Sequence, residues 1–337
     1  MSSPALNIED LSVYLQGKII LKDFTLCLNQ GEILCLLGPS GCGKTTALKA
    51  LAGLLEAKHG TIHLFDQVLK HNRFELPPEQ RDIGFIFQDY ALFPHMSVAD
   101  NIGFSLKSLN KEARNTTIQQ NLDLVNLSHL GERFPHELSG GQQQRTAVAR
   151  ALAKRPKLLL MDEPFSNIDS QIKYKLMAEL REILKQSQIT CIFVTHSKQE
   201  AFHFADKTAI LNNGKIEQVD NTQVIFERPK NTFVAQFMEA GNLIESKHIP
   251  AALFLQPIKN EASDDWLLLQ ENGFKLVDES VGVKGLVIDS VYIGHRYRNH
   301  IQCDGFKLWL ETLQALNTDE HINIQYQLTP LVLANNA

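Results

Sequence analysis

A five-residue apolar run followed directly by a glycine-rich loop constrains this chain more than any other feature. Ile33–Leu37 reads Ile-Leu-Cys-Leu-Leu, a pattern typical of a β-strand buried on both faces. A helix is expected from Thr45 to about Lys58, with Gly60 at its C′ position. A strand, a loop and a helix in this order predict a phosphate-binding turn. The loop residues fit the pattern G-x-x-x-x-G-K-[ST], and they are Gly38, Pro39, Ser40, Gly41, Cys42, Gly43, Lys44, Thr45 and Thr46.

The loop has the chemistry of a phosphate cradle. Its glycines let successive backbone N–H groups turn inward, toward phosphate oxygens. In this pattern Lys44 reaches the β- and γ-phosphates, and the Thr45 hydroxyl binds Mg²⁺. Cys42 lies at the helix N-terminus beside Lys44, which predicts a lowered thiol pKa. A plain flexible turn is the alternative, and the strand before the loop and the helix after it favour the phosphate site.

Apolar segments alternate with stretches of helical character along the rest of the first 240 residues. Strands are expected at Ile83–Phe87, Leu158–Met161 and Cys191–Val194. Helices are expected at about 111–130, 142–153, 169–186 and 233–238. Strands that alternate with helices predict a parallel sheet with helices packed on it, an α/β fold.

Other segments have the period-two pattern of β-strands. Phe24, Leu26 and Leu28 alternate with polar residues, as in a strand with one buried face, and 61–69 is also strand-like. Gly214 marks a hairpin. A domain boundary is expected at Gly241. Beyond it, a small all-β domain is predicted from short β-type segments at 286–293, 297–302, 307–310 and 322–327.

Two acidic residues, Asp162 and Glu163, follow the apolar segment Leu158–Met161. A buried parallel strand delivers the residues after it to the carboxyl edge of the sheet, where the phosphate loop also lies. Asp162 is therefore predicted to hold Mg²⁺ through a water molecule. Glu163 is predicted to act as the general base that polarises the water attacking the γ-phosphate. Without the phosphate loop, an exposed acidic turn would be an equally good interpretation.

A second helix N-terminus with free N–H groups is predicted after Ser139. Ser139 is a good N-cap residue, Gly140 and Gly141 open the backbone, and a helix follows from Gln142. This turn is a second phosphate-binding surface. Two such surfaces in one chain favour a sandwich, in which the turn of one copy covers the nucleotide held by another copy. A plain capped helix is the alternative.

Composition limits the possible functions. A length of 337 residues indicates about two domains. The net charge of -5, from 33 basic and 38 acidic residues, gives no electrostatic reason to expect binding to nucleic acid. No apolar run approaches the roughly 18 residues of a membrane span, and the N-terminus lacks the pattern of a signal peptide. The five cysteines are widely spaced, which favours reduced thiols in the cytosol over disulfides or a zinc site.

Together these motifs resemble those of the ATPase subunits of ABC transporters. The resemblance implies an ATPase domain over residues 1–240, with a RecA-like core, an antiparallel β subdomain and a helical subdomain. It implies a small TOBE- or OB-like regulatory or dimerisation domain over 241–337, and it implies ATP and Mg²⁺ as cofactors. The segments that occur in the family's order and at about its spacings are Gly38–Thr46, Gln88, Leu138–Arg145, Leu160–Pro164, Ser166–Asp169 and His196.

The resemblance assigns roles to further residues one at a time. Gln88 looks like the Q-loop glutamine, which links Mg²⁺ or the attacking water to the membrane partner. His196 looks like the switch histidine that contacts the γ-phosphate. Leu138–Gln142 looks like the signature motif, which would bind ATP in trans together with Asp169. Tyr14 resembles the aromatic residue that stacks on adenine, with simple core packing as its alternative.

The resemblance is to importers of the maltose, polyamine, sulfate and iron(III) group. Phe93–Ile102 looks like the segment that receives a cytoplasmic helix of the permease. The short tail and Phe134–Leu138 look most like iron(III) importer subunits. This implies a homodimer on the cytoplasmic face of the inner membrane, bound to two integral membrane permease subunits. A periplasmic or lipid-anchored binding protein would supply the substrate.

Three alternatives stay open at this point. The first is import of another substrate, such as a polyamine, sulfate or a sugar. The second is a soluble ABC ATPase that acts in translation or on DNA without transport. The third is a binding module, in which the β-rich tail senses an anion or a protein partner and gates the ATPase.

Overall fold

The computed structural model describes residues 4–256 and 265–333. The chain forms two compact units, Met1–Thr222 and Gln223–Ala337. The sequence places the boundary between the domains later, between residues 240 and 241, and this boundary stays a prediction. In the described part of the chain, no helix is long and apolar enough to cross a bilayer.

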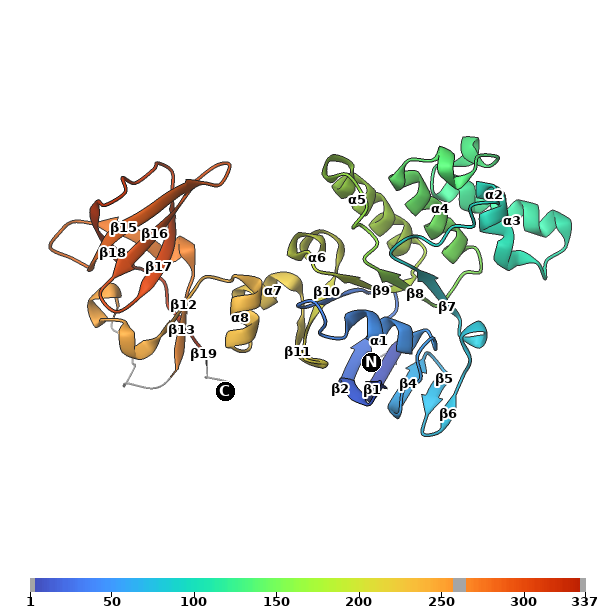
Figure 1. Cartoon of the computed structure of the whole chain (residues 1–337), viewed down its shortest axis with the longest axis horizontal. Helices are drawn as coiled ribbons and strands as arrows, with labels where there is room; N and C mark the ends of the chain where they lie inside the picture. The colour runs from blue at the N-terminus through green and yellow to red at the C-terminus, as the bar shows by residue number, and fades with distance from the viewer. Residues whose placement is uncertain (1–3, 257–264, 334–337) are drawn as a thin grey trace. The chain divides into compact units, whose positions relative to one another are not determined.

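The first unit is built on a six-stranded sheet with the order β11-β10-β3-β9-β8-β7 (Figure 1). Its five strands from β10 to β7 run parallel, and β11 pairs antiparallel with β10 through the predicted hairpin at Gly214. Every residue of β3, β8 and β9 is buried, which confirms the predicted α/β fold class. The strands are β3 (Ile33–Leu37), β7 (Ile83–Ile86), β8 (Leu158–Asp162), β9 (Thr190–Thr195), β10 (Lys207–Asn212) and β11 (Lys215–Asp220).

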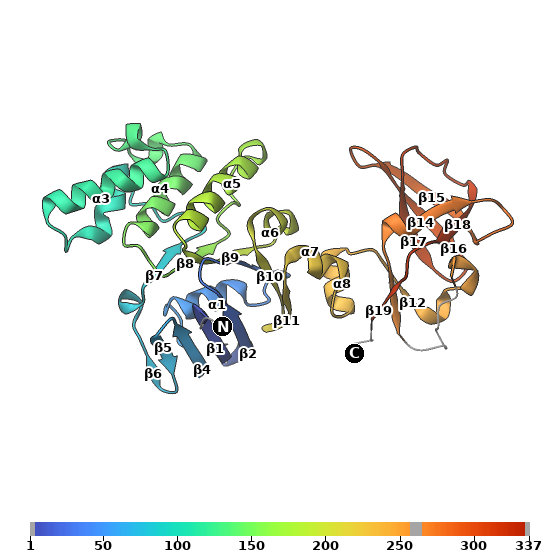
Figure 2. The same cartoon turned by 180° about the vertical axis from the view of Figure 1, so that it is seen from behind.

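Helices cover both faces of this sheet. In Figures 1 and 2, α1 lies on one side and α4, α5 and α6 lie on the other, while α2, α3 and α4 pack together as a helical region. The α-helices are α1 (Lys44–Leu51), α2 (Val98–Gly103), α3 (Lys111–Leu124), α4 (Gly140–Leu152), α5 (Ser170–Gln186) and α6 (Lys198–Phe204). Short 3-10 helices are η1 (Pro78–Gln80), η2 (Phe104–Leu106), η3 (Ser128–Leu130) and η4 (Pro135–Glu137).

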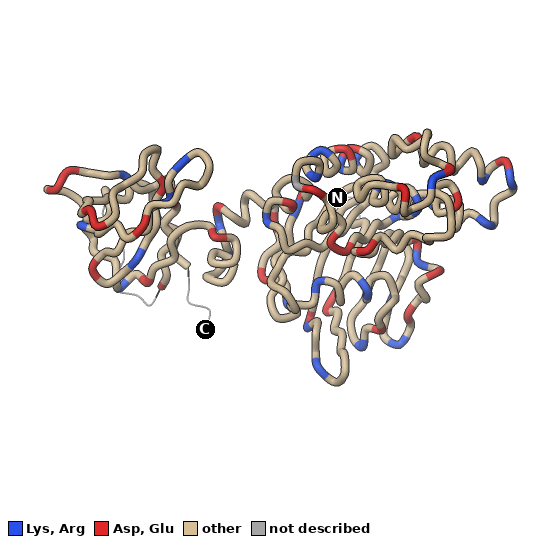
Figure 3. The backbone as a smooth tube through the Cα atoms, turned by 45° about the horizontal axis from the view of Figure 1, so that its top comes forward, with Lys and Arg blue, Asp and Glu red and all other residues tan. Residues whose placement is uncertain are grey.

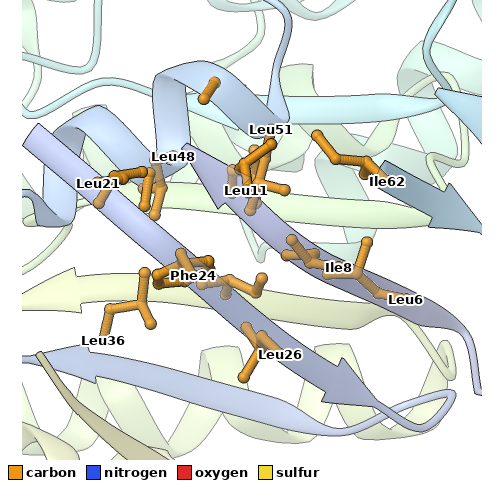
Figure 4. Packing of buried hydrophobic residues seen from close by; sticks show 14 of the residues in the cluster. Leu6, Ile8, Leu11, Leu21, Phe24, Leu26, Leu36, Leu48, Leu51 and Ile62 are labelled. Atoms are coloured by element: carbon orange, nitrogen blue, oxygen red, sulfur yellow. The ribbon is translucent and has the colours of Figure 1, made fainter. Parts of the chain in front are cut away.

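An antiparallel sheet with the order β2-β1-β4-β5-β6 packs over α1. Phe24 of β2, Leu36 of β3 and Leu48 of α1 belong to one core cluster (Figure 4). Burying each such side chain contributes about 1.5–3 kcal/mol, so this core fixes α1, and the loop before it, on the sheet. The strands are β1 (Leu6–Leu15), β2 (Lys18–Leu28), β4 (His59–Leu64), β5 (Gln67–His71) and β6 (Phe74–Glu75).

The helix after the phosphate loop is shorter than the sequence predicts. α1 ends at Leu51 rather than near Lys58, so the prediction of Gly60 as its C′ residue is wrong, and Gly60 lies in β4. The buried Arg81 guanidinium donates hydrogen bonds to the carbonyls of Ala50 and Leu51 at 2.9 and 2.7 Å. The helix itself ends before Gly53, whose φ of 77° forms a glycine turn typical of helix C-termini, and Arg81 adds a partner for the last carbonyl groups.

The second unit is rich in β-strands, and charged residues of both signs are spread along both units (Figure 3). Helix α7 (Thr222–Glu227) spans the boundary between the units, and α8 (Thr232–Met238) follows. Two antiparallel sheets, with the orders β12-β13-β19 and β14-β18-β15-β16-β17, contribute to one core that includes Leu267 and Ile324. This β-rich unit agrees with the TOBE-like architecture expected from the sequence.

Four strands of the second unit overlap the predicted segments, and four others were not predicted. The overlapping strands are β15 (Val283–Tyr292), β16 (Tyr297–Cys303), β17 (Lys307–Thr312) and β18 (His321–Tyr326). The others are β12 (Asn242–Glu245), β13 (Trp266–Leu269), β14 (Phe274–Val277) and β19 (Leu331–Leu333). Short 3-10 helices are η5 (Ser246–His248), η6 (Ala251–Leu253) and η7 (Glu271–Gly273).

Candidate functional site

Three loops meet at one edge of the six-stranded sheet. The register pairs Leu37 of β3 with Thr195 of β9, and it pairs Val194 of β9 with Asp162 of β8. Since these strands are parallel, the residues after them leave from the same edge. The predicted phosphate loop follows β3, and the predicted switch histidine follows β9. The predicted acidic pair consists of the last residue of β8 and the residue after it. The fold therefore brings together residues that lie far apart in the sequence.

Lys44 closes the phosphate loop. Its Nζ donates hydrogen bonds to the carbonyl oxygens of Gly38 and Pro39 at 2.8 and 2.9 Å, and the residue is 8% exposed. Gly43, just before α1, has a φ of 108°, which glycine adopts without steric cost. A Cβ at Gly43 would lie 2.9 Å from a methyl group of Leu21. The loop thus curls around an ammonium group that can exchange its carbonyl acceptors for phosphate oxygens.

Thr45 and Asp162 lie side by side at the end of the loop. The Thr45 hydroxyl donates a hydrogen bond to Asp162 Oδ1 at 3.0 Å. Burial raises the pKa of Asp162, and the neighbouring Glu163 carboxylate adds to this effect against the lowering by the Thr45 hydrogen bond. A hydroxyl oxygen and a carboxylate oxygen are ligands that Mg²⁺ prefers, so this pair fits the ion. Over residues 4–256 and 265–333, there is no group of three or more His, Cys, Asp or Glu that could hold a metal ion.

Glu163 lies between Gln88 and His196. Gln88 Nε2 donates a hydrogen bond to Glu163 Oε2 at 3.1 Å, and His196 Nδ1 lies 3.4 Å from Glu163 Oε1. The Glu163 backbone has a φ of 44°, which is uncommon outside glycine, and its N–H donates to the Val194 carbonyl at 3.0 Å. Its side chain is 25% exposed. The three residues predicted to be catalytic therefore lie at one point that water can reach.

Two residues without a predicted role hold the loop that carries Gln88. Arg150, on α4, donates hydrogen bonds to the carbonyls of Tyr90 and Ala91 at 2.8 and 2.6 Å. Asn167 Nδ2 donates to the Gln88 carbonyl at 3.2 Å. These contacts span 60 and 79 residues, and no local sequence pattern indicates them.

The Ser139 turn and Asp169 cap two other helices. Ser139 Oγ accepts a hydrogen bond from Gln142 N at 3.4 Å, and Gln142 Oε1 accepts one from Ser139 N at 2.9 Å. This confirms Ser139 as the N-cap residue, although α4 begins at Gly140 rather than at Gln142. Asp169 caps α5 through Gln171 N at 2.8 Å. Among the described residues, no hydrogen bond or ion pair joins Ser139 or Asp169 to the phosphate loop, so their binding of ATP in trans stays a prediction.

The predictions for Tyr14 and Cys42 have different outcomes. Tyr14 lies in β1 with a half-buried side chain, and Lys58 Nζ lies 4.9 Å from the centre of its ring. Its stacking on adenine stays a prediction. The lowered pKa predicted for the Cys42 thiol is wrong. Cys42 is 5% exposed, and burial raises the pKa of its thiol despite Lys44 Nζ at 3.8 Å from its Sγ.

Known proteins are similar in sequence to this chain. The model of the family described as "ABC transporter" matches residues 21–166. The Fe(3+) ions import ATP-binding protein FbpC 2 of Haemophilus influenzae is 36% identical in a 328-residue alignment that covers 93% of this chain and 92% of that protein. The spermidine/putrescine import ATP-binding protein PotA of Oleidesulfovibrio alaskensis is 42% identical over 240 residues, 71% of this chain and 63% of that protein. The sulfate/thiosulfate import ATP-binding protein CysA of Neisseria meningitidis serogroup B is 42% identical over 252 residues, 72% of this chain and 69% of that protein.

A solved structure shares the fold of two thirds of the chain. It is that of cbiO1 from Clostridium perfringens, titled as part of the ABC transporter complex cbiONQ. The TM-score is 0.62 at 27% identity, and the match covers 67% of this chain and 92% of that one.

Proposed function

This chain belongs to the ATP-binding subunits of ABC importers, and from that premise we propose that the cargo whose import it powers is iron(III). The observation that carries this choice is the extent of the similarity. The iron(III) relative matches 93% of this chain, which includes most of the second unit. The polyamine and sulfate relatives match 71% and 72% and leave more than a quarter of the chain unmatched.

In this proposal, residues 1–240 form the ATPase domain, and residues 241–337 form a regulatory or dimerisation domain. ATP binds at the loop Gly38–Thr46, where backbone N–H groups and Lys44 neutralise the phosphate oxygens. Tyr14 stacks on the adenine. The Thr45 hydroxyl and the Asp162 carboxylate, with Gln88, would hold Mg²⁺, which supplies charge neutralisation at the β- and γ-phosphates.

We assign hydrolysis to Glu163 and its two neighbours, Gln88 and His196. The Glu163 carboxylate accepts a proton from a water molecule as the water oxygen bonds to the γ-phosphorus. The bond between the γ-phosphorus and the bridging oxygen breaks, and its electron pair leaves with ADP. Gln88 holds the carboxylate at 3.1 Å, and His196 orients the γ-phosphate from the other side. The amide and the imidazole thus fix the base and the phosphate relative to each other.

A second copy of the chain completes each site. The residues proposed to act in trans are Ser139, Gly140, Gly141, Gln142 and Asp169. The capping box uses the Gln142 N–H, and the N–H groups before it in the first turn of α4 have no acceptor within the helix, so they can donate to the γ-phosphate bound by the partner copy. ATP then joins the two copies only while its γ-phosphate is present, so hydrolysis releases them.

The partners follow from this cycle. We assign the dimer to the cytoplasmic face of the inner membrane, bound to two integral membrane permease subunits. Closing and opening of the dimer would drive the permease, and a periplasmic or lipid-anchored protein would deliver the iron(III). No residue of this chain needs to contact the cargo.

The cargo is tested by uptake in cells whose own copy of this chain is replaced by its Glu163→Gln variant. We expect uptake of radiolabelled iron(III) to fall to the level of a deletion strain, while uptake of labelled spermidine and sulfate stays unchanged. A Glu182→Gln strain serves as the matched control, because Glu182 is an exposed residue of α5. Unchanged iron(III) uptake together with loss of spermidine or sulfate uptake would show that another cargo is the correct one.

A further inference from the structure

A buried ion pair lies next to the turn that carries His196. Glu200, on α6, is 4% exposed. One oxygen of its carboxylate accepts a hydrogen bond from the Thr195 hydroxyl at 2.6 Å, and the other accepts one from Lys173 Nζ at 3.0 Å. Lys173 belongs to α5, so the carboxylate joins two helices to the end of β9. Nothing so far assigns a role to these residues.

Thr195 and Ser197, the residues before and after His196, belong to the hydrogen-bond network around Glu200. Thr195 Oγ1 accepts a hydrogen bond from Ser197 N at 3.0 Å, and Glu200 N donates one to Ser197 Oγ at 3.3 Å. His196 lies between them, and its own side chain is 67% exposed. The packing around the imidazole is therefore sparse, and its position depends on the backbone on either side. That backbone is held through the Glu200 carboxylate.

The other end of the network reaches the Asp169 turn. Lys173 N donates a hydrogen bond to the Asp169 carbonyl at 3.0 Å, within the first turn of α5. The Tyr174 hydroxyl adds a second link between α5 and α6, because it donates to Gln199 Oε1 at 2.8 Å. A shift of the Asp169 turn therefore moves Lys173 and, through the ion pair, Glu200.

We infer that Glu200 is a positioning residue for ATP hydrolysis. It couples the position of His196 to the position of the Asp169 turn through its hydrogen bonds with Thr195 and Lys173. This inference rests on the proposed role of His196 at the γ-phosphate. Among the described residues, no hydrogen bond links Glu200 to the phosphate loop, so we expect ATP binding not to depend on it. A change at Glu200 should therefore act on turnover and not on affinity.

The test compares Glu200→Gln and Lys173→Met in the full-length chain. Each variant loses the charge pair and keeps the length of its side chain. We expect kcat for ATP hydrolysis to fall by about tenfold to 10²-fold, since a misplacement of about 1 Å costs up to this much. The Kd for ATP, from equilibrium titration with a fluorescent ATP analogue, should stay within about twofold, a change of only about 0.4 kcal/mol. Glu182→Gln is the control for the same chemical change on the exposed face of α5.

The double variant Glu200→Gln/Lys173→Met separates coupling from general damage. Because the two residues act as one unit, its kcat should lie within about twofold of the lower single variant. A wild-type kcat in folded Glu200→Gln and Lys173→Met would overturn the inference. So would a loss of ATP affinity as large as the loss of kcat, because this indicates a structural role alone.

His196→Ala distinguishes a failure of this inference from a failure of the proposed function. A wild-type kcat in His196→Ala would remove the proposed role of His196, and with it the inference. A low kcat in His196→Ala beside a wild-type kcat in the Glu200 variant would overturn the inference alone.

Discussion

Replacing Glu163 with glutamine should slow ATP hydrolysis by about 10²- to 10⁴-fold, the range for loss of a general base. The amide has nearly the same shape as the carboxylate but cannot accept a proton from the attacking water. Gln88 and His196 keep a partner of the same size at 3.1 and 3.4 Å. ATP affinity should therefore change little. The measurement is the steady-state rate of phosphate release at saturating MgATP, together with a binding titration.

Glu182→Gln is again the matched control, and it should hydrolyse ATP at the wild-type rate. Activity of Glu163→Gln within about threefold of wild type, far from the loss of at least about 10²-fold expected for a general base, would show that another group takes the proton. Equal losses of hydrolysis and of ATP binding would instead place Glu163 in the binding of the nucleotide.

Replacing Lys44 with alanine should weaken ATP binding by roughly 10- to 150-fold, since hydrogen bonds to charged groups contribute about 1.5–3 kcal/mol. The ammonium group is held in the loop by the carbonyls of Gly38 and Pro39, so it is already placed where phosphates are expected to bind. Its removal leaves the phosphate charge without its nearest side-chain cation. Isothermal titration with MgATP measures the change.

Lys154→Ala, which removes an exposed lysine from the same unit, should bind ATP like the wild type. Thermal unfolding of Lys44→Ala shows whether the loop variant is folded. Wild-type ATP affinity in folded Lys44→Ala would contradict the assignment of this loop to the phosphates.

Patterns that are local in the sequence predicted the centre of the fold. Ile33–Leu37, Leu158–Met161 and Cys191–Val194 are continuous apolar runs, and each lies within a fully buried strand of the parallel sheet. The alternation of Phe24, Leu26 and Leu28 likewise matches a strand with one buried face. A strand that is buried along its whole length appears in the sequence as a run of consecutive apolar residues, and this local pattern was sufficient to predict these strands.

Features set by distant contacts were not predictable in the same way. The end of α1 is not one of these features, because it lies just before Gly53, whose φ is 77°, and a glycine turn of this kind is typical of helix C-termini. The strand-like segment 61–69 is split into β4 and β5 by a turn at Phe65, whose φ is 50°, although phenylalanine is not a typical turn residue. The unpredicted strands of the second unit are three or four residues long, too short to show a period.

In the candidate site, too, some residues could be predicted from local sequence patterns and others could not. The phosphate loop and the acidic pair were found from their residues, because their chemistry lies in adjacent positions. Gln88 and His196 needed the family resemblance, since a single glutamine or histidine has no pattern of its own. Glu200 and Lys173 were not found, because an ion pair across 27 residues appears only in the folded chain. The buried Cys42 thiol shows that burial outweighs a nearby lysine, which the sequence alone did not indicate.

The shared ATP site is tested most directly by the mass of the Glu163→Gln chain in solution, measured by light scattering with saturating MgATP. Because this variant should bind ATP without hydrolysing it, we expect the mass to rise from 38.0 kDa to twice that value. Adding Ser139→Arg places a bulky side chain at the turn that should cover the partner's γ-phosphate, and the rise should disappear. A mass that stays at 38.0 kDa with MgATP, or a rise that Ser139→Arg does not remove, would contradict a site made by two copies.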